Sequence, residues 1–226
     1  MNPPPLSVLY EDNHLLVVSK PAGLPTMGTP DGLPTLLTLA KEYVKQRYQK
    51  PGNVYLGVMS RLDAPVTGVV LLARTSKAAA RLTEQFRTHS VEKRYWAVVE
   101  GVLESPEGSL VDWLSHDDRH RRMHIVGVTH PGAKEARLSY QCRGLIKGNS
   151  WLEVTLETGR KHQIRLQLAH RGHPIIGDRK YGSREPFSAG IALHSRRLVI
   201  SHPTTGSRLE FEAPLPDTWR RFGINA

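Results

Sequence analysis

Apolar residues in the first part of the chain follow a strand pattern and then a helical one. Residues 6–19 predict a β-hairpin with a polar turn at residues 11–13, and Lys20–Gly23 (Lys-Pro-Ala-Gly) ends it sharply. After a stretch rich in proline and glycine, Thr35–Tyr48 repeats apolar residues at helical spacing. An amphipathic helix with a basic outer face is expected there.

The next segment predicts a strand, a helix and a strand. Gly68–Arg74 is an apolar run, and Ser76–Arg87 has strong helical periodicity with Ser76 as its candidate N-cap. Tyr95–Glu100 then returns to a strand pattern. The two strands and the helix between them should form part of the core.

Residues 101–148 are poorer in apolar residues and predict only short β-like pieces. They contain a run rich in histidine and arginine, residues 116–124, which reads as an insertion that faces the substrate. The remaining predicted elements are a strand at Leu152–Leu156, a helix at Lys161–His170, and two strands near Leu198 and Leu209 joined by a turn at Pro203–Gly206.

Strands and helices interleave without regular βαβ units and without internal repeats. This order predicts an α+β fold with a mixed, largely antiparallel central sheet and flanking helices. The 226 residues, 39% of them hydrophobic, can bury one sizeable core, so a single domain over residues 1–226 is expected.

The charge balance points to a polyanionic partner. Lys and Arg number 31 against 21 Asp and Glu, which gives a net charge of +10. Residues 1–110 hold 12 basic and 10 acidic side chains, whereas residues 111–226 hold 19 and 11. Such a surface recruits nucleic acid by counterion release, although a merely soluble basic protein would look the same.

Cysteine usage and the N-terminal residues bear on the compartment. Cys142 is the single cysteine, so an internal disulfide and a four-cysteine zinc site are both excluded. The chain shows no signal-peptide pattern and no apolar run near the ~20 residues of a membrane span. A cytoplasmic protein that does not contact membrane, with a monomer as the default state, is expected.

Two classes of site are disfavoured. Neither glycine-rich phosphate-binding motif is present, so a nucleotide cofactor is not expected. His116, His120 and His124 would share one face of a helix, as metal ligands do, but the arginines between them would repel a cation. No metal is expected, and an RNA-facing role of this segment is the preferred reading.

Two polar segments carry candidate chemistry. Ser60–Gly68 places Arg61 and Asp63 just before a buried strand, where such a pair is commonly structural. Gly159–Leu168 starts a helix with several hydrogen-bonding side chains and suggests a polar helix N-terminus at a site. Neither segment is decisive by itself.

Together these segments resemble the RluA-type pseudouridine synthases, and the resemblance covers nearly the whole chain in the right order. The matching motifs are Lys20–Gly23 after a hairpin, Arg61-Leu62-Asp63 with Thr67-Gly68, Lys93-Arg94-Tyr95, Gly159-Arg160 with His162-Gln163-Ile164-Arg165, Gly172–Ile175, Gly177-Asp178 and Tyr181-Gly182. Two departures are Ser60, where the family usually has His, and Val66-Thr67-Gly68, where Thr-Ser-Gly is usual.

The resemblance implies isomerisation of uridine to pseudouridine in structured RNA, either ribosomal or transfer RNA. It implies a sheet with a central catalytic cleft, base flipping, no cofactor, and no room for the auxiliary N-terminal RNA-binding domain of many relatives. Asp63 would be the catalytic carboxylate, acting as a nucleophile or as a base at C2′, and Arg165 its electrostatic support.

The remaining roles follow from the same resemblance. Arg61 would enter the RNA stack as the base leaves, unless it forms only a surface ion pair. Tyr95 would stack on uracil and could help to remove the C5 proton, unless it is a core residue. Substrate contacts are also expected from these residues of the second segment: Arg160, His162, Gln163 and one of Ile164 and Leu166.

Two alternatives remain at this stage. A non-catalytic RNA-binding or assembly protein on the same fold would need only the positive charge. An RNA or DNA glycosylase would also flip a nucleotide toward an acid, but it would release free uracil.

Overall fold

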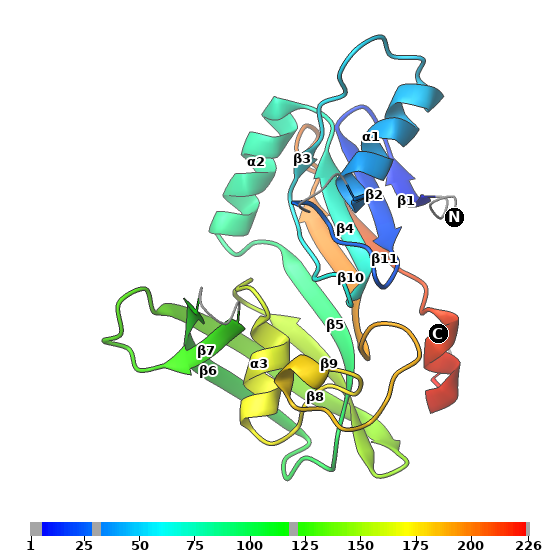
Figure 1. Cartoon of the computed structure of the whole chain (residues 1–226). Helices are drawn as coiled ribbons and strands as arrows, with labels where there is room; N and C mark the ends of the chain where they lie inside the picture. The colour runs from blue at the N-terminus through cyan, green and yellow to red at the C-terminus, as the bar shows by residue number, and fades with distance from the viewer. Residues whose placement is uncertain (1–5, 29–32, 118–121, 225–226) are drawn as a thin grey trace. The chain divides into compact units, whose positions relative to one another are not determined.

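A computed structural model describes residues 6–28, 33–117 and 122–224, which form two compact units (Figure 1). Unit 1 contains the described residues up to Val91 and the segment Ser195–Asp217. Unit 2 contains Glu92–His194 and the described residues from Thr218 onward.

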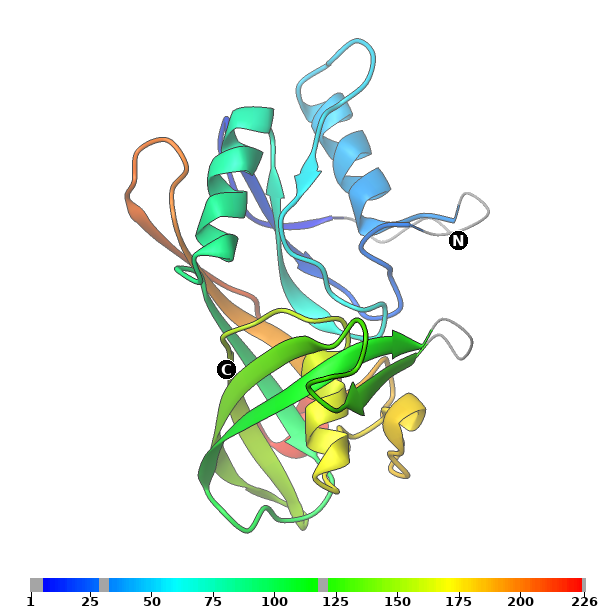
Figure 2. The same cartoon turned by 90° about the vertical axis from the view of Figure 1, so that its left-hand side faces the viewer.

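Unit 1 is a sheet with a helix on either side. Its strands are β1 (Ser7–Glu11), β2 (Leu15–Lys20), β3 (Gly57–Val58), β4 (Thr67–Ala73), most of β10 (Leu193–Ser201) and β11 (Arg208–Glu212). β2 pairs with β1 and β4, β4 also pairs with β3 and β10, and β10 pairs with β11. Figure 2 shows α1 (Leu36–Arg47) and α2 (Ser76–Arg87) on either side of these strands.

Strand alternation explains why unit 1 needs two helices. β2 and β4 are apolar on both faces, and residues 15–18 of β2 have no exposed surface. On one face, Leu15, Val17 and Leu71 pack with Ala78 and Leu82 of α2. Because successive side chains of a strand point to opposite faces, the second face must be covered separately.

Threonines cap both helices of unit 1. Thr35 accepts a hydrogen bond from the Thr38 N–H at 3.1 Å, and Thr38 caps the Thr35 N–H in return. Thr75, rather than the predicted Ser76, caps α2 by accepting from the Ala78 N–H. The prediction failed by one residue because either hydroxyl could accept the bond, and only the extended backbone of Thr75 puts its side chain in reach.

The strands of unit 2 pair antiparallel with one another, and α3 lies across one face of them (Figure 1). The paired strands follow the order β5-β9-β8-β6-β7. Their bounds are Glu92–Val99, Asn149–Leu156, Lys134–Ile146, Glu107–Asp117 and Arg122–Val126, followed in the chain by α3 (Gln163–His170) and two 3-10 turns, η2 (Arg179–Tyr181) and η3 (Asp217–Phe222). Leu166 of α3 packs on Leu114, Met123 and Ala136.

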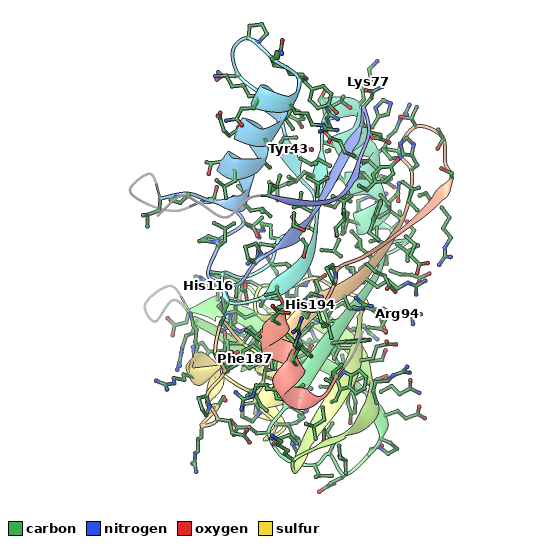
Figure 3. The ribbon with its side chains drawn as sticks, turned by 90° about the vertical axis from the view of Figure 1, so that its right-hand side faces the viewer. Tyr43, Lys77, Arg94, His116, Phe187 and His194 are labelled. Atoms are coloured by element: carbon green, nitrogen blue, oxygen red, sulfur yellow. The ribbon has the colours of Figure 1, made fainter. Side chains whose placement is uncertain are left out.

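Aromatic contacts attach η3 to the rest of unit 2. Figure 3 labels Phe187 and His194 beside this turn. The rings of Phe187 and Phe222 stack with centroids 5.7 Å apart, and His194 meets Trp219 edge-on at 6.1 Å. The last described turn of the chain therefore packs on unit 2 through its rings.

The predicted α+β class with a largely antiparallel sheet is confirmed. The prediction of short β-like pieces in residues 101–148 is wrong, because β6 has 11 residues and β8 has 13. Both strands bury one face only, and their exposed positions are mostly polar. The average hydrophobicity of these residues therefore does not reveal how long the strands are. The single catalytic domain stays a prediction beside the two packing units.

None of the helices in the described ranges combines the length and apolar character that a bilayer crossing requires.

Candidate functional site

Asp63, the predicted catalytic carboxylate, lies in a turn that leads into β4. The Asp63 carbonyl accepts a hydrogen bond from the Val66 N–H at 3.0 Å, which closes the turn. The Asp63 side chain is half-buried, whereas Arg61 is exposed. The carboxylate of Asp63 is thus partly shielded from solvent, whereas the guanidinium of Arg61, two residues earlier in the chain, is accessible to solvent or to a ligand.

Buried backbone contacts hold this turn, called here the Asp63 loop (residues 59–66). The Thr26 hydroxyl donates to the Leu62 carbonyl at 2.8 Å and accepts from the Leu62 N–H at 3.1 Å. The Gly23 N–H donates to the Ala64 carbonyl at 2.8 Å. Residues on both sides of Asp63 are therefore fixed to the segment that follows β2.

Ser60, which replaces the usual histidine, has a structural contact of its own. Its hydroxyl accepts a hydrogen bond from the Leu71 N–H of β4 at 2.9 Å. A short hydroxyl reaches the neighbouring strand in this way and ties the start of the Asp63 loop to the sheet.

Lys20 is a buried cation beside the Asp63 loop. Its side chain is among the largest fully buried in the chain, at 1% exposed. The ammonium donates to the carbonyls of Pro21 and Leu24 at 2.8 Å each and of Ala64 at 3.1 Å, so three acceptors match its three protons. Burial lowers the pKa of Lys20 to about 7, and the negative charge of Asp63 opposes that shift.

In unit 2, Gln163 fixes the start of α3. Its carbonyl oxygen accepts from the Thr158 hydroxyl at 2.8 Å and from the Arg160 N–H at 3.0 Å, and its amide donates to the Arg137 carbonyl at 3.0 Å. His162, the N-cap position, is in the left-handed region with φ 55°. This conformation ends the turn, so α3 begins two residues later than predicted.

Arg165 is held in a buried ion pair with Asp178. Its Nε and Nη2 donate to the two carboxylate oxygens at 2.6 and 2.8 Å, and the two side chains are 5% and 1% exposed. The Tyr181 ring centroid lies 5.1 Å from the guanidinium carbon. A bidentate carboxylate and an aromatic ring therefore set the plane of the guanidinium.

Tyr95 lies on β5 opposite Val154 of β9. Strand alternation and the registers put it on the same face as Ala136, the face that α3 covers. Tyr95 is half-buried on that face.

The other predicted substrate residues differ in exposure. Ile164 is 4% exposed, and Leu166 packs into the core beneath α3. Arg160 is exposed and donates through Nε to the Glu135 carbonyl at 2.8 Å. His162 Nδ1 lies 2.6 Å from the Tyr181 hydroxyl.

The predicted set is divided between the units: Asp63 and Arg61 belong to unit 1, and the rest to unit 2. Sequence analysis noted Lys20, Asp178 and Tyr181 only as members of motifs that resemble the family and did not predict a role for any of them. The position of Lys20 at the end of an apolar strand could have indicated that its side chain is buried. Thr26 carried no signal, because its two bonds depend on a residue 36 positions away.

The structure does not place His116 and His124 on a helix. His116 and His124 lie on adjacent strands, and since Ser115 is the partner of His124, the two histidines point to opposite faces of the β6–β7 hairpin. His120, Arg119 and Arg121 lie outside the described residues, and Arg122 is exposed. In the described part of the chain no three His, Cys, Asp or Glu residues are arranged to hold a metal ion.

Comparison with known proteins agrees with this geometry. The family model for RNA pseudouridylate synthase matches residues 14–170. The Ribosomal large subunit pseudouridine synthase D of Xanthomonas campestris is 36% identical over 96% of this chain and 68% of its own length. The protein of the same name from Pseudomonas aeruginosa is 35% identical over 94% and 69%.

Solved structures give the same result. Human RNA Pseudouridylate Synthase Domain Containing 4 superposes with a TM-score of 0.79 at 25% identity, over 97% of this chain and 94% of that one. Human RNA Pseudouridylate Synthase Domain Containing 1 superposes with a TM-score of 0.73 at 26% identity, over 96% and 87%. The chain therefore belongs to the RNA pseudouridylate synthase family and is an RNA pseudouridine synthase.

Proposed function

We propose that this enzyme isomerises uridine in ribosomal large-subunit RNA and that Asp63 is its catalytic carboxylate. The observation that carries the assignment is the Asp63 loop, in which a half-buried acid is fixed by backbone bonds at Leu62 and Ala64 next to the buried cation Lys20. The substrate rests on the names of the relatives.

The reaction explains why a carboxylate is needed. The N1–C1′ bond of uridine must break, the uracil must turn while it stays bound, and C5 must bond to C1′ with loss of the C5 proton. Positive charge builds at C1′ as the first bond breaks, and a carboxylate stabilises or captures it. Removal of the C2′ proton by the same carboxylate is the other route, and both need Asp63 to be ionised. No electrons enter or leave, so the chemistry requires no redox cofactor.

Cations keep such an acid ionised. In its protonated form Lys20 contributes from within unit 1, since its charge and that of Asp63 interact favourably. Arg165 is the second cation in the proposal. Its ion pair with Asp178 and the ring of Tyr181 hold its guanidinium in one orientation, which a positioned catalytic charge requires.

Substrate contacts are divided by exposure. Arg61 and Arg160 are exposed and suit RNA, and in the proposal Arg61 fills the stack that the flipped base leaves. Tyr95 stacks on the uracil. Gln163 is 3% exposed with both polar atoms bonded in the turn before α3, so it positions the helix rather than reading the base.

Ile164, Leu166 and His162 complete the proposed site. Leu166 packs beneath α3 and Ile164 is buried as well, and neither is singled out as the contact to the base. His162 contributes through its contact with Tyr181. The cytoplasmic location and the monomeric state stay predictions.

The β6–β7 hairpin is proposed as an RNA-binding surface. Its exposed Arg122 and the basic run around it would neutralise phosphates, so replacing Arg122 with alanine should weaken RNA binding and lower the salt slope by about one unit. Unchanged affinity and slope would remove Arg122 from that surface.

The test of Asp63 is tritium release from transcripts labelled at uridine C5, with wild type compared to Asp63→Asn and to Asp217→Asn as a matched exposed control. Ribosomal and transfer RNA are assayed side by side. Release by the wild type and control, none by Asp63→Asn, and no free uracil would establish the role of Asp63 and identify the RNA.

Three results would contradict the proposal. Equal release by Asp63→Asn would remove Asp63 from catalysis. Free uracil in the product would identify a glycosylase. Release from transfer RNA alone would keep the chemistry and overturn the ribosomal substrate.

A further inference from the structure

One short turn of unit 2 contacts both the β6–β7 hairpin and the start of α3. The turn is η2, and Tyr181 is its last residue. The Tyr181 hydroxyl accepts a hydrogen bond from the Met123 N–H of β7 at 3.3 Å. The Arg122 side chain donates to the Lys180 carbonyl in the same turn. The first two residues of β7 are thus both bonded to η2.

The same tyrosine reaches the residues around Arg165. Its hydroxyl lies 2.6 Å from His162 Nδ1, and the two rings meet edge-on with centroids 5.6 Å apart. The centroid of its ring lies 5.1 Å from the guanidinium carbon of Arg165. Asp178, whose carboxylate binds that guanidinium, directly precedes η2. One side chain therefore contacts the hairpin, the N-cap of α3 and Arg165.

The backbone of His162 indicates that its position matters. Its φ of 55° lies in the left-handed region, which ordinary residues seldom adopt and which costs about 1–3 kcal/mol. Such a conformation persists where surrounding contacts hold it, and the Tyr181 hydroxyl is one of them. Loss of that hydroxyl should let the start of α3 shift.

We propose that Tyr181 is a positioning residue that sets the orientation of Arg165 and couples it to the β6–β7 hairpin. The inference rests on the proposed function, in which Arg165 acts in catalysis and the hairpin binds RNA. RNA that engages the hairpin would then stabilise the arrangement of η2 in which Arg165 is correctly held. Tyr181 touches no reacting atom in this scheme.

The test separates turnover from binding. Tyr181→Phe keeps the ring beneath Arg165 and removes only the hydroxyl that joins β7 to His162. It should lower kcat by about 10- to 100-fold, because small misplacements of a catalytic group have effects of that size. KM and the Kd for RNA should change by less than about threefold, since the phosphate contacts remain.

A double-mutant cycle identifies the route. His162→Asn is chosen because asparagine tolerates the left-handed backbone. If the two residues act through their mutual hydrogen bond, the double variant should lose no more kcat than the worse single variant. Tyr140→Phe, a half-buried tyrosine on β8, is the matched control and should leave kcat unchanged.

The outcomes are distinct. A Tyr181→Phe enzyme with wild-type kcat would overturn the positioning role, as would a loss confined to KM or fully additive losses in the cycle. A wild-type enzyme without tritium release from any RNA would instead overturn the proposed function. All assays run at a temperature where circular dichroism shows each variant to be folded, so that loss of folded protein is not read as loss of turnover.

Discussion

Lys20 should make the stability of the protein depend on pH above neutrality. Its ammonium is 1% exposed and sits among three carbonyl oxygens, and burial lowers its pKa from 10.5 to about 7. In the unfolded chain the lysine keeps its ordinary pKa. A shift of this size corresponds to about 5 kcal/mol of differential stability.

The sign follows from proton binding. Below pH 7 both states hold the proton, and the burial penalty on the charged lysine is fully present. Between pH 7 and 10.5 the unfolded chain binds more protons than the folded one, so the free energy of unfolding rises with pH. Relative to pH 6, the gain in the free energy of unfolding that is due to Lys20 is complete above pH 10.5.

Urea denaturation of the wild type and Lys20→Met at pH 6, 7.5, 9 and 10 isolates this effect. Methionine has similar length and does not titrate, so other groups cancel in the difference between the two proteins. Over that range the free energy of unfolding of the wild type should rise by about 4 kcal/mol relative to that of the variant. Lys77→Met is the control, since Lys77 is exposed on α2 (Figure 3) and its difference curve should be flat.

A flat difference curve for Lys20→Met would refute this reasoning. It would mean that the three carbonyls and the charge of Asp63 hold the proton against burial, so that Lys20 titrates only at its ordinary pKa. Asp63→Asn provides an internal check. Without the opposing negative charge, the rise should begin at lower pH.

Three further substitutions test single contacts. Asp178→Asn removes the carboxylate of a buried ion pair and should cost about 3–5 kcal/mol in urea denaturation, and a loss below about 1 would contradict that role. Gly68→Ala puts a Cβ into the backbone of Ser195 at a φ of +114°, so it should lose at least about 3 kcal/mol or fail to fold, as thermal melting will show. Thr75→Ala should lose about 1 kcal/mol by chemical denaturation, while Ser76→Ala stays within about 0.5, and the reverse order would reassign the cap.

Local patterns predicted the elements well where one face of each element is consistently apolar. The first hairpin, α1, α2, β4 and the last strand pair lie within a few residues of their predicted ranges. These elements bury a regular set of side chains, so periodicity in the sequence reports their type directly. The motif around Asp63 was also recognisable, because the acid, the arginine and the strand after them are contiguous.

Patterns failed where the deciding partner is distant. The 11- and 13-residue strands of unit 2 look weakly apolar, and only their pairing with neighbouring strands makes them stable. The four-residue spacing of the histidines in residues 116–124 was uninformative for a related reason. Residues four apart lie one turn apart on the same face of a helix, whereas His116 and His124 lie on paired strands with their side chains on opposite faces.

The sequence by itself determined the class of protein, most of its elements outside residues 101–148 and the acid proposed for catalysis, because contiguous motifs and local periodicity carry that information. Only the tertiary structure decided how those groups are held. One of the three carbonyls that bind the Lys20 ammonium belongs to Ala64, 44 residues away, and Arg165 is paired with Asp178, 13 residues away. Burial and the choice of partner depend on which segments the fold brings into contact, so no local pattern could specify them.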